Sequence, residues 1–391
     1  MPRRVWLVCH RWVALVLGGI LILSGVTGGL LVVARPLDRL LHPAYFVAES
    51  RPDEGAVPLE TVRRNLVEAF GPNASLTFDP PRRAGDTLQV RVRAAWRGTV
   101  YLDPSSGREQ GRRAEDEGVV AVLYQLHSAL MLGQMGKAVL AWAALAYLVL
   151  MVSGLVIWWP RKWPPSLRMV FDKGTLRALF DVHRQGGAIL AVFLAVSVTT
   201  GAYLAWRPIG GWITAVSGQA RVVAPKLPEL SGLAGGMAPL QAGMPQSSSA
   251  MPPLQTGTRE PPSLDVFAAA AQAEFPDGEI GFILYTPHRD RPMAIRMRVA
   301  DDPHPNGRST VWLDPRDGTV LAAQRWNELD PGTRINSVIY PLHTGELGGP
   351  AGEVVVGVLG LGLGLVGGSG LWLWWRRRSL RRGRGSAGRG V

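Results

Sequence analysis

Four long stretches of the chain contain no Asp, Glu, Lys or Arg, and they restrict the possible folds more than any other feature. About 20 apolar residues in a helix cross the hydrocarbon core of a bilayer. One such run is also compatible with a buried helix of a soluble protein. Four runs with aromatic residues at their ends instead predict a membrane protein with four transmembrane helices. The runs cover residues 12–34, 138–159, 185–206 and 354–375.

The basic residues predict how these helices are oriented. They give a net charge of +12 and lie in short blocks beside the apolar runs, so we expect a lipid bilayer as partner and no nucleic acid. Because Lys and Arg accumulate on the cytoplasmic side, we expect a multi-pass protein of the bacterial inner (cytoplasmic) membrane with cytoplasmic N- and C-termini. The blocks are residues 3–11, 161–177 and 376–391, and Trp158, Trp159, Trp374 and Trp375 would form an aromatic belt on that side.

The two longest intervening segments are expected in the periplasm, and they have the same plan. Each has a helical run (61–70 and 263–275), then an alternating strand (88–93 and 293–299), then a strand that ends in a Pro/Gly turn (98–107 and 309–318). We therefore expect two α+β modules. Residues 224–262 are rich in Gly, Pro, Met, Gln and Ser, which favours a mobile linker over a methionine copper site.

The expected domain order follows directly. It is transmembrane helix 1 (1–34), module 1 (35–117), an interfacial segment with helix 2 (118–160), a cytoplasmic loop (161–182), helix 3 (183–206), a linker with module 2 (207–341), an interfacial segment with helix 4 (342–375) and a basic tail (376–391). The single cysteine, Cys9, excludes an intramolecular disulfide.

Matching spacings indicate an internal duplication. The pair Thr27-Gly28 lies as far beyond His10 as the pair Thr200-Gly201 lies beyond His183. A Ser-Gly pair likewise follows His127 and His343 at one and the same spacing. Two parallel repeats of this kind are expected to pack about a pseudo-twofold axis normal to the membrane. The small residues allow either close helix packing or room for a flat cofactor, and they are Thr27, Gly28, Ser153, Gly154, Thr200, Gly201, Ser369 and Gly370.

The four repeated histidines are the candidate site. A histidine in or beside a span is a functional-site hypothesis, although any one of them could simply bond to a neighbouring helix. Zinc and proton relay both lack accompanying carboxylates or cysteines at short spacing. Axial ligation of heme iron by two imidazoles fits best, and the axis would place His10 opposite His183 near the cytoplasmic face and His127 opposite His343 near the outer face.

Other residues near this site have less specific signals. Arg11 and Arg184 could pair with heme propionates, or equally with lipid phosphate. His127 lies well before its charge-free run, which begins only after Lys137, so residues 126–135 must be interfacial or dip back among protein. His42, His288 and His304 lie outside the repeat and are expected on the surface.

Several short motifs of the sequence resemble those of a known family. "Tyr-Leu-Asp-Pro-Ser-Ser-Gly" and "Trp-Leu-Asp-Pro-Arg-Asp-Gly" resemble the PepSY domain. "His-Arg" opens spans one and three, "Leu-His-Ser" and "Leu-His-Thr" precede spans two and four, and "Trp-Trp-Pro-Arg-Lys" closes span two. Over residues 1–378 the chain is similar to PepSY-associated transmembrane proteins, which include iron-regulated inner-membrane proteins and ferric-siderophore reductases with b-type heme. The resemblance implies heme ligation at His10, His127, His183 and His343.

The favoured hypothesis is an oxidoreductase of the ferric-siderophore reductase type with two copies of heme b, which moves electrons across the membrane to a periplasmic ferric siderophore or other ferric chelate. No nucleotide-binding fingerprint is present, so a quinol or a protein is the expected electron donor. The chelate would dock in a groove between the modules, near Arg91, Arg93, Arg296 and Arg298, although charged alternate positions are also typical of a solvated strand. The main alternative is a non-enzymatic membrane anchor whose modules bind peptide or protein or regulate a protease. A weaker alternative is a metal-uptake accessory without heme.

Overall fold

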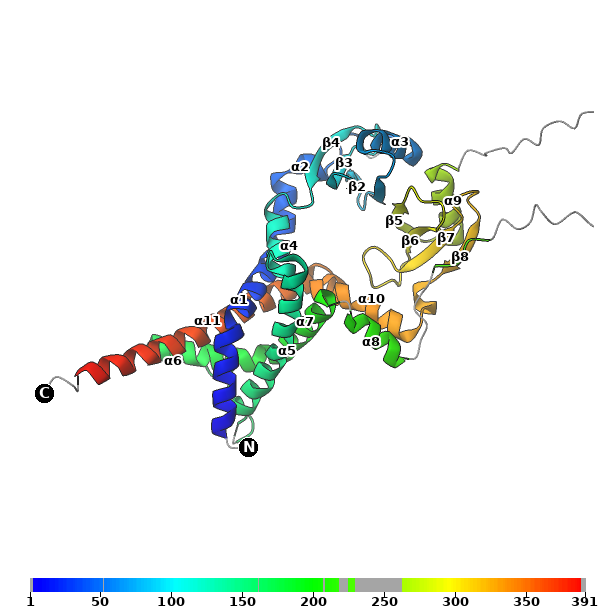
Figure 1. The fold of residues 1–391 in the computed structure, drawn as a ribbon. Coiled ribbons are helices and arrows are strands. Elements are labelled where there is room, and N and C mark those ends of the chain that lie inside the picture. The colour runs from blue at the N-terminus through cyan, green and yellow to red at the C-terminus, as the bar shows by residue number, and fades with distance from the viewer. Residues whose placement is uncertain are drawn as a thin grey trace, which may run out of the picture.

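The computed structural model describes residues 3–51, 53–160, 162–206, 208–217, 224–228 and 262–387. It consists of a bundle of long helices and a β-sheet that lies at one end of the bundle (Figure 1). The beginning of α1 and the last turns of α11 lie at the opposite end (Figure 1). The linker predicted over 224–262 lies outside the described residues except at 224–228 and 262.

Four helices are long and apolar enough to cross a membrane, as the charge-free runs predict. The first is α1 (Arg3–Leu41) and the second is α5 (Gly133–Trp158). The third is continuous from α6 (Thr175–Asp181) through a π-helical turn (Val182–Gly186) into α7 (Gly187–Ala205). The fourth is α11 (Gly349–Ala387). With 39 residues, α1 is about 58 Å long. Since this exceeds a bilayer core of about 30 Å, α1 continues toward the sheet.

Close backbone contact joins α1 to α11. A Cβ added at Gly25 would lie 2.8 Å from the carbonyl oxygen of Gly360, and one at Gly29 would lie 2.9 Å from that of Gly357. These two glycines are one helical turn apart, so they share one face of α1. Small residues at this spacing let membrane helices approach closely. The first and last spans are therefore packed together although they come from opposite ends of the chain.

Short helices connect the spans to the sheet. A four-residue helix, α2 (Pro43–Phe46), follows α1, and α8 (Pro208–Ser217) follows α7. The helix α4 (Val119–Ala129) precedes α5, and α10 (Pro331–Thr344) precedes α11. Leu130 and Met131 have positive φ angles between α4 and α5. The backbone N–H groups of Leu130 and Leu132 donate to the carbonyl oxygens of Leu126 and Ala129. Residues 126–135, which were expected to be interfacial or to dip back among protein, therefore belong to two helices joined by a hydrogen-bonded turn.

The sheet is a single antiparallel sheet of eight strands in the order β4-β3-β2-β1-β5-β6-β7-β8. The central pairing, β1 with β5, aligns Leu76 with Tyr285 and Phe78 with Ile283. The first four strands are β1 (Ser75–Asp79), β2 (Leu88–Arg93), β3 (Arg97–Leu102) and β4 (Glu109–Ala114). The last four are β5 (Glu279–Tyr285), β6 (Met293–Arg298), β7 (Ser309–Leu313) and β8 (Val320–Gln324).

This pairing corrects one expectation. The two expected modules are joined edge to edge, so the strands of the described chain leave no groove between them for a docked chelate. Three of the four candidate arginines also have partners within the protein. Arg91 pairs with Asp79 at 3.0 Å and Arg298 with Glu279 at 3.6 Å. Arg296 donates to the carbonyl oxygen of Arg308 at 2.9 Å.

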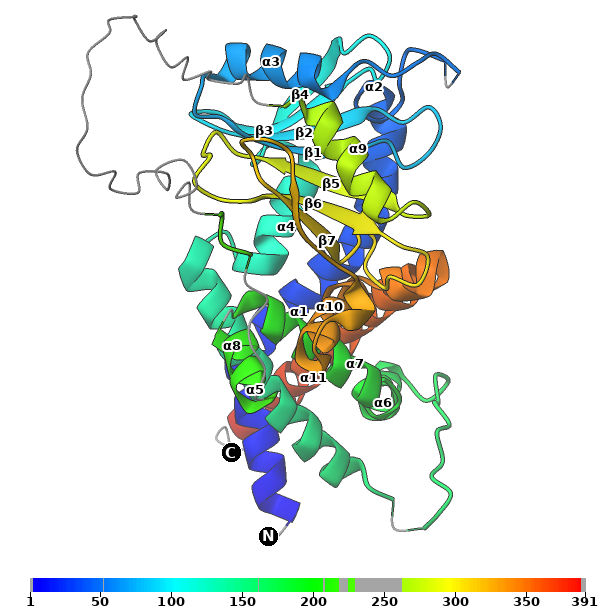
Figure 2. The same ribbon diagram turned by 90° about the vertical axis from the view of Figure 1, so that its right-hand side faces the viewer.

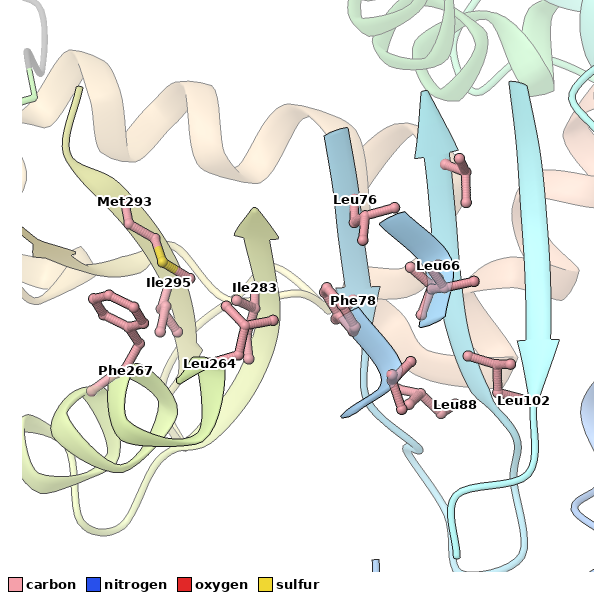
Figure 3. Close-up of a cluster of buried hydrophobic side chains, with 14 of the residues drawn as sticks. Leu66, Leu76, Phe78, Leu88, Leu102, Leu264, Phe267, Ile283, Met293 and Ile295 are labelled. Carbon is pink, nitrogen blue, oxygen red and sulfur yellow. The ribbon is translucent and has the colours of Figure 1, made fainter. Parts of the chain in front are cut away.

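One face of the sheet forms the core of this part of the protein. Side chains alternate along a strand, so Val90 and Val92 of β2 point to the same face as Ile295 and Met297 of β6. All four are at most 1% exposed. The helices α3 (Leu59–Phe70) and α9 (Leu264–Glu274) cover this face, and their buried leucine and phenylalanine side chains meet the strands (Figures 2 and 3).

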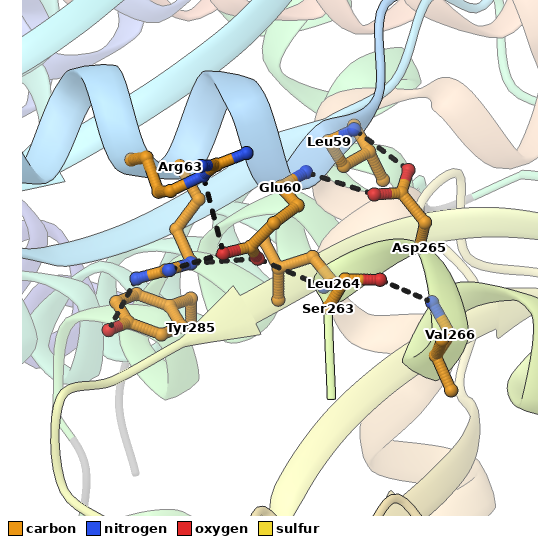
Figure 4. A network of polar contacts seen from close by, with 9 residues as sticks. Leu59, Glu60, Arg63, Ser263, Leu264, Asp265, Val266 and Tyr285 are labelled. Carbon is orange, nitrogen blue, oxygen red and sulfur yellow. Dashed lines mark hydrogen bonds and ion pairs between the residues drawn. The ribbon is translucent and has the colours of Figure 1, made fainter. Parts of the chain in front are cut away.

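The two covering helices cap each other at their first turns (Figure 4). The Asp265 carboxylate accepts the backbone N–H groups of Leu59, at 2.8 Å, and Glu60, at 3.1 Å. In return, the Glu60 carboxylate accepts the N–H of Leu264 at 3.1 Å. The first N–H groups of a helix have no partner within it, so these carboxylates satisfy donors of the opposite half and join the two halves across the β1–β5 pairing.

Candidate functional site

The structure brings the four repeated histidines together as two pairs. His10 lies on α1 and His183 in the π-helical turn before α7, and their ring centroids are 6.2 Å apart. His127 on α4 and His343 on α10 have ring centroids 6.1 Å apart. Each pair combines one histidine from each half of the chain. We call the first the inner pair, because it lies far from the sheet, and the second the outer pair.

A backbone carbonyl of a neighbouring helix fixes each ring of the inner pair. His10 Nδ1 lies 3.1 Å from the carbonyl oxygen of Leu150 on α5. His183 Nδ1 lies 2.9 Å from that of Val366 on α11. A carbonyl only accepts, so Nδ1 must carry the proton in both rings. Nε2 then carries the lone pair. This is the tautomer in which a histidine binds a metal through Nε2.

The outer pair is held in the same way. His127 Nδ1 lies 2.9 Å from the carbonyl oxygen of Ser24 on α1, and His343 Nδ1 lies 3.1 Å from that of Ser197 on α7. These bonds also require a proton on Nδ1 and leave Nε2 free. Each histidine is therefore hydrogen-bonded to a helix from its own half of the chain. Each pair, in contrast, combines histidines from the two halves.

The glycines of the four small-residue pairs form the seats of the rings. An added Cβ would lie 2.7 Å from the His127 ring at Gly28 and 3.0 Å from the His343 ring at Gly201. The corresponding distances are 3.3 Å from His10 at Gly154 and 2.8 Å from His183 at Gly370. Each glycine is one helical turn beyond the carbonyl that its histidine contacts, so both are on one helix face. The glycine therefore admits the imidazole that the carbonyl then orients.

The hydroxyls beside these glycines complete two of the seats. Ser153 Oγ lies 2.9 Å from His10 Nδ1, and Thr200 Oγ1 lies 3.0 Å from His343 Nδ1. From the sequence, these small residues were expected to allow close helix packing or to leave room for a cofactor. Their contact with the histidines was not predicted. The repeated spacings between each histidine and its small-residue pair were the available signal. The sequence could not indicate which carbonyl groups the histidines contact, since every residue carries a backbone carbonyl.

The distance within each pair fits two imidazoles that bind one metal ion. A metal–imidazole bond is about 2 Å long and the nitrogen is about 1.1 Å from its ring centroid, so two imidazoles bound on opposite sides of one metal ion would have centroids about 6.2 Å apart. The observed 6.2 and 6.1 Å agree with this. Among the described residues, no group of three or more His, Cys, Asp or Glu side chains is placed to hold a metal ion.

The two pairs lie at different depths along the bundle. His10 belongs to the inner pair, and Ser24 and Gly28 seat the outer one. The part of α1 that separates His10 from these two seat positions is about 21–27 Å long. Buried aliphatic side chains pack between the pairs, among them Leu21, Leu194 and Leu359.

The remaining candidates differ in position. Arg11 is exposed and its guanidinium lies 5.7 Å from the centre of the Trp12 ring, and Arg184 lies in the π-helical turn. Their contact with a propionate therefore stays a prediction. His42 and His288 are exposed, as expected. His304 is not a free surface residue, because its ring stacks on Tyr340 of α10 at 5.4 Å.

The chain has four helices that are long and apolar enough to span a membrane, an antiparallel sheet at one end of the bundle, and paired histidines between its halves. These features define a class of integral membrane protein. Within that class, the model of the family described as PepSY-associated TM region matches residues 7–377. The match covers nearly the whole chain, so the chain belongs to this family. A search of curated proteins gave no match.

Proposed function

We propose that this protein is a heme-containing reductase that moves electrons across the bacterial inner membrane to a ferric chelate. The observation that carries the proposal is the geometry of the two pairs: four imidazoles on separate helices, with ring centroids at 6.2 and 6.1 Å. Each pair would hold one heme b through its Nε2 atoms. Bound there, heme would supply one-electron redox chemistry.

The protein's contribution would be to hold the ligands before the cofactor arrives. The Nδ1 bonds to Leu150, Val366, Ser24 and Ser197 set the tautomer and the ring plane. Outer hydrogen bonds of this kind raise the basicity of a histidine ligand. Because the carbonyls belong to rigid spanning helices, little conformational freedom would be lost on ligation. Zinc is less well matched, because structural zinc takes four protein ligands and each pair offers two.

The two depths support transfer across the membrane. One site at one depth would leave most of a bilayer core of about 30 Å uncrossed, whereas the inner and outer pairs together extend over most of it. His10 lies near the start of α1, at the end of the bundle away from the sheet, whereas α4 and α10, which carry His127 and His343, lie nearer the sheet (Figure 1). With cytoplasmic termini, a quinol or protein donor would deliver electrons at the inner pair, and the ferric chelate would accept them on the side of the sheet.

The optical spectrum of the purified full-length protein tests the proposal. We expect reduced-minus-oxidised bands of six-coordinate, low-spin b-type heme. His10→Ala and His183→Ala should remove one component, and His127→Ala and His343→Ala should remove the other. His42→Ala and His288→Ala are matched controls, because both side chains are exposed.

Two results would contradict the proposal. If His10→Ala and His127→Ala remove the same component, the pairing between the halves is wrong. If no variant or preparation binds heme, the reductase proposal fails. The alternative of a membrane anchor whose sheet binds peptide or protein would then be the better explanation. Reoxidation of the dithionite-reduced protein by a ferric siderophore, measured with the appearance of Fe²⁺, tests the acceptor separately.

A further inference from the structure

The loop over residues 299–308, between β6 and β7, contacts both the sheet and α10. Gly307 has a φ of +71°, and a Cβ there would lie 2.1 Å from the carbonyl oxygen of Met297, so the loop is pressed against the end of β6. On its other side, the ring of His304 stacks on Tyr340 of α10. The loop therefore links the sheet to the helix that carries His343.

Two arginines in this region, Arg296 and Arg308, form no close ion pair with a carboxylate among the described residues. Arg296 Nη1 donates to two neutral acceptors, the Arg308 carbonyl at 2.9 Å and Thr310 Oγ1 at 2.8 Å. Arg308 Nε is buried and has no hydrogen-bond partner. Within the described part of the chain, neither guanidinium has an acidic oxygen within the 4.0 Å of an ion pair.

Asp302 attracts both guanidinium groups, but it forms an ion pair with neither of them among the described residues. The Asp302 carboxylate is engaged with the backbone N–H groups of His304, Arg308 and Ser309. Burial, together with the nearby Arg308, lowers the pKa of Arg296 to about 10. Burial, Arg308 and Arg296 together lower the pKa of His304 to about 4, so its imidazole is neutral at pH 7. Its Nδ1 accepts the N–H of Asn306 at 3.1 Å, which leaves Nε2–H as a donor.

These donors lie beside the outer histidine pair. Tyr340 is one helical turn before His343 on α10. Arg308 interacts electrostatically with Tyr203 of α7. Tyr203 follows closely after Gly201, which contacts the His343 ring. The loop and the end of β6 thus place two guanidinium groups and one neutral N–H donor at the junction of the sheet and the bundle.

We infer that Arg308, supported by Arg296 and His304, forms a carboxylate-binding site next to the outer histidine pair. A guanidinium can donate two parallel, charge-assisted hydrogen bonds to a carboxylate. A buried nitrogen without a hydrogen-bond partner is unfavourable, so a bound anion that accepts from Arg308 Nε would stabilise this region. The carboxylate would come from a propionate of a bound heme or from an acidic chelator; the first source rests on the proposed function and the second does not.

Two measurements on the full-length protein in nanodiscs distinguish the sources. The variants are Arg308→Gln, which removes the charge, and Arg308→Lys, which keeps the charge but cannot donate two parallel hydrogen bonds. Arg291→Gln is the control, since it removes the same charge from a side chain that is 83% exposed. The first measurement is a redox titration of the outer spectral component. The second is a calorimetric titration with citrate.

If a heme propionate occupies the site, Arg308→Gln should lower the reduction potential of the outer heme component by about 59 mV, which corresponds to a tenfold change in the equilibrium constant for one electron. Arg308→Lys should then give an intermediate potential, and citrate should have no effect. A chelator site predicts instead at least a tenfold weaker citrate affinity in Arg308→Gln at an unchanged potential. If neither quantity differs from that of Arg291→Gln while Arg308→Lys remains folded, the inference is wrong. Absence of heme would remove the first source and leave the citrate titration decisive.

Discussion

Glu60 and Asp265 each cap the helix on which the other lies, across the junction of the two halves of the sheet. Glu60 is also paired with Arg63 on its own helix, and Arg63 donates to Tyr285 at the end of β5. The network therefore includes both covering helices and one of the two central strands (Figure 4). It supplements the three aligned residue pairs of β1 and β5.

The substitution Asp265→Ala should loosen this junction. It leaves the N–H groups of Leu59 and Glu60 without acceptors, and loss of a helix cap costs about 0.5–2 kcal/mol. We expect a lower unfolding temperature and faster amide hydrogen exchange at Leu59 and Glu60 in the full-length protein. Asp277→Ala is the control, because Asp277 is exposed near the end of the same helix. Equal exchange rates in the two variants would show that the cap contributes nothing.

The substitution Gly28→Ala should disturb the outer histidine seat selectively. The added methyl would lie 2.7 Å from the His127 ring, closer than real Cβ contacts occur. Overpacking typically costs about 1–3 kcal/mol, so we expect His127 to move and the outer spectral component to weaken. Gly19→Ala on the same helix is the control, since nothing lies within 4 Å of its added Cβ. Identical spectra of the two variants would argue against the seat.

A carboxylate in the first half of the sheet should make stability depend on acid pH. Burial would raise the pKa of Asp103, but N–H bonds from Ser106 and Ser50 lower it to about 2. The usual value is about 3.9, so the charged form contributes about 2 kcal/mol above about pH 4, and this contribution is lost as pH falls toward about 2.

Asp103→Asn should therefore lower stability at pH 7 and flatten its dependence on pH between 4 and 2, measured by chemical unfolding. Asp116→Asn, which changes an exposed residue, should keep the dependence of the parent protein. An unchanged slope in Asp103→Asn would contradict the assignment.

Cysteine labelling in intact spheroplasts should establish the orientation. In a Cys9→Ser background, Ser105→Cys and Asp317→Cys should react with an impermeant maleimide, because both positions are in turns of the sheet. Ser166→Cys and Ser386→Cys should react only after the membrane is opened, since arginine-rich segments face the cytoplasm. Labelling of only the second set in intact cells would mean the reverse orientation.

The sequence by itself determined the local elements. The absence of charge over four long runs located the four candidate spans, because a helix needs about 20 apolar residues to cross a bilayer. Alternation located β2 and β6, since side chains of a strand point alternately to two faces. The spacings after His10 and His127 indicated which histidines to compare, and symmetry suggested how to pair them.

Only the tertiary structure decided how these elements meet. It joined the modules into one sheet through β1 and β5, where separate modules and a groove were expected. It also oriented each histidine with a carbonyl that is distant in sequence, and it buried the Nε atom of Arg308. Carbonyls and strand edges are the same chemical groups at nearly every residue, so composition cannot indicate which of them are partners. Their partners are fixed by the packing of the whole chain.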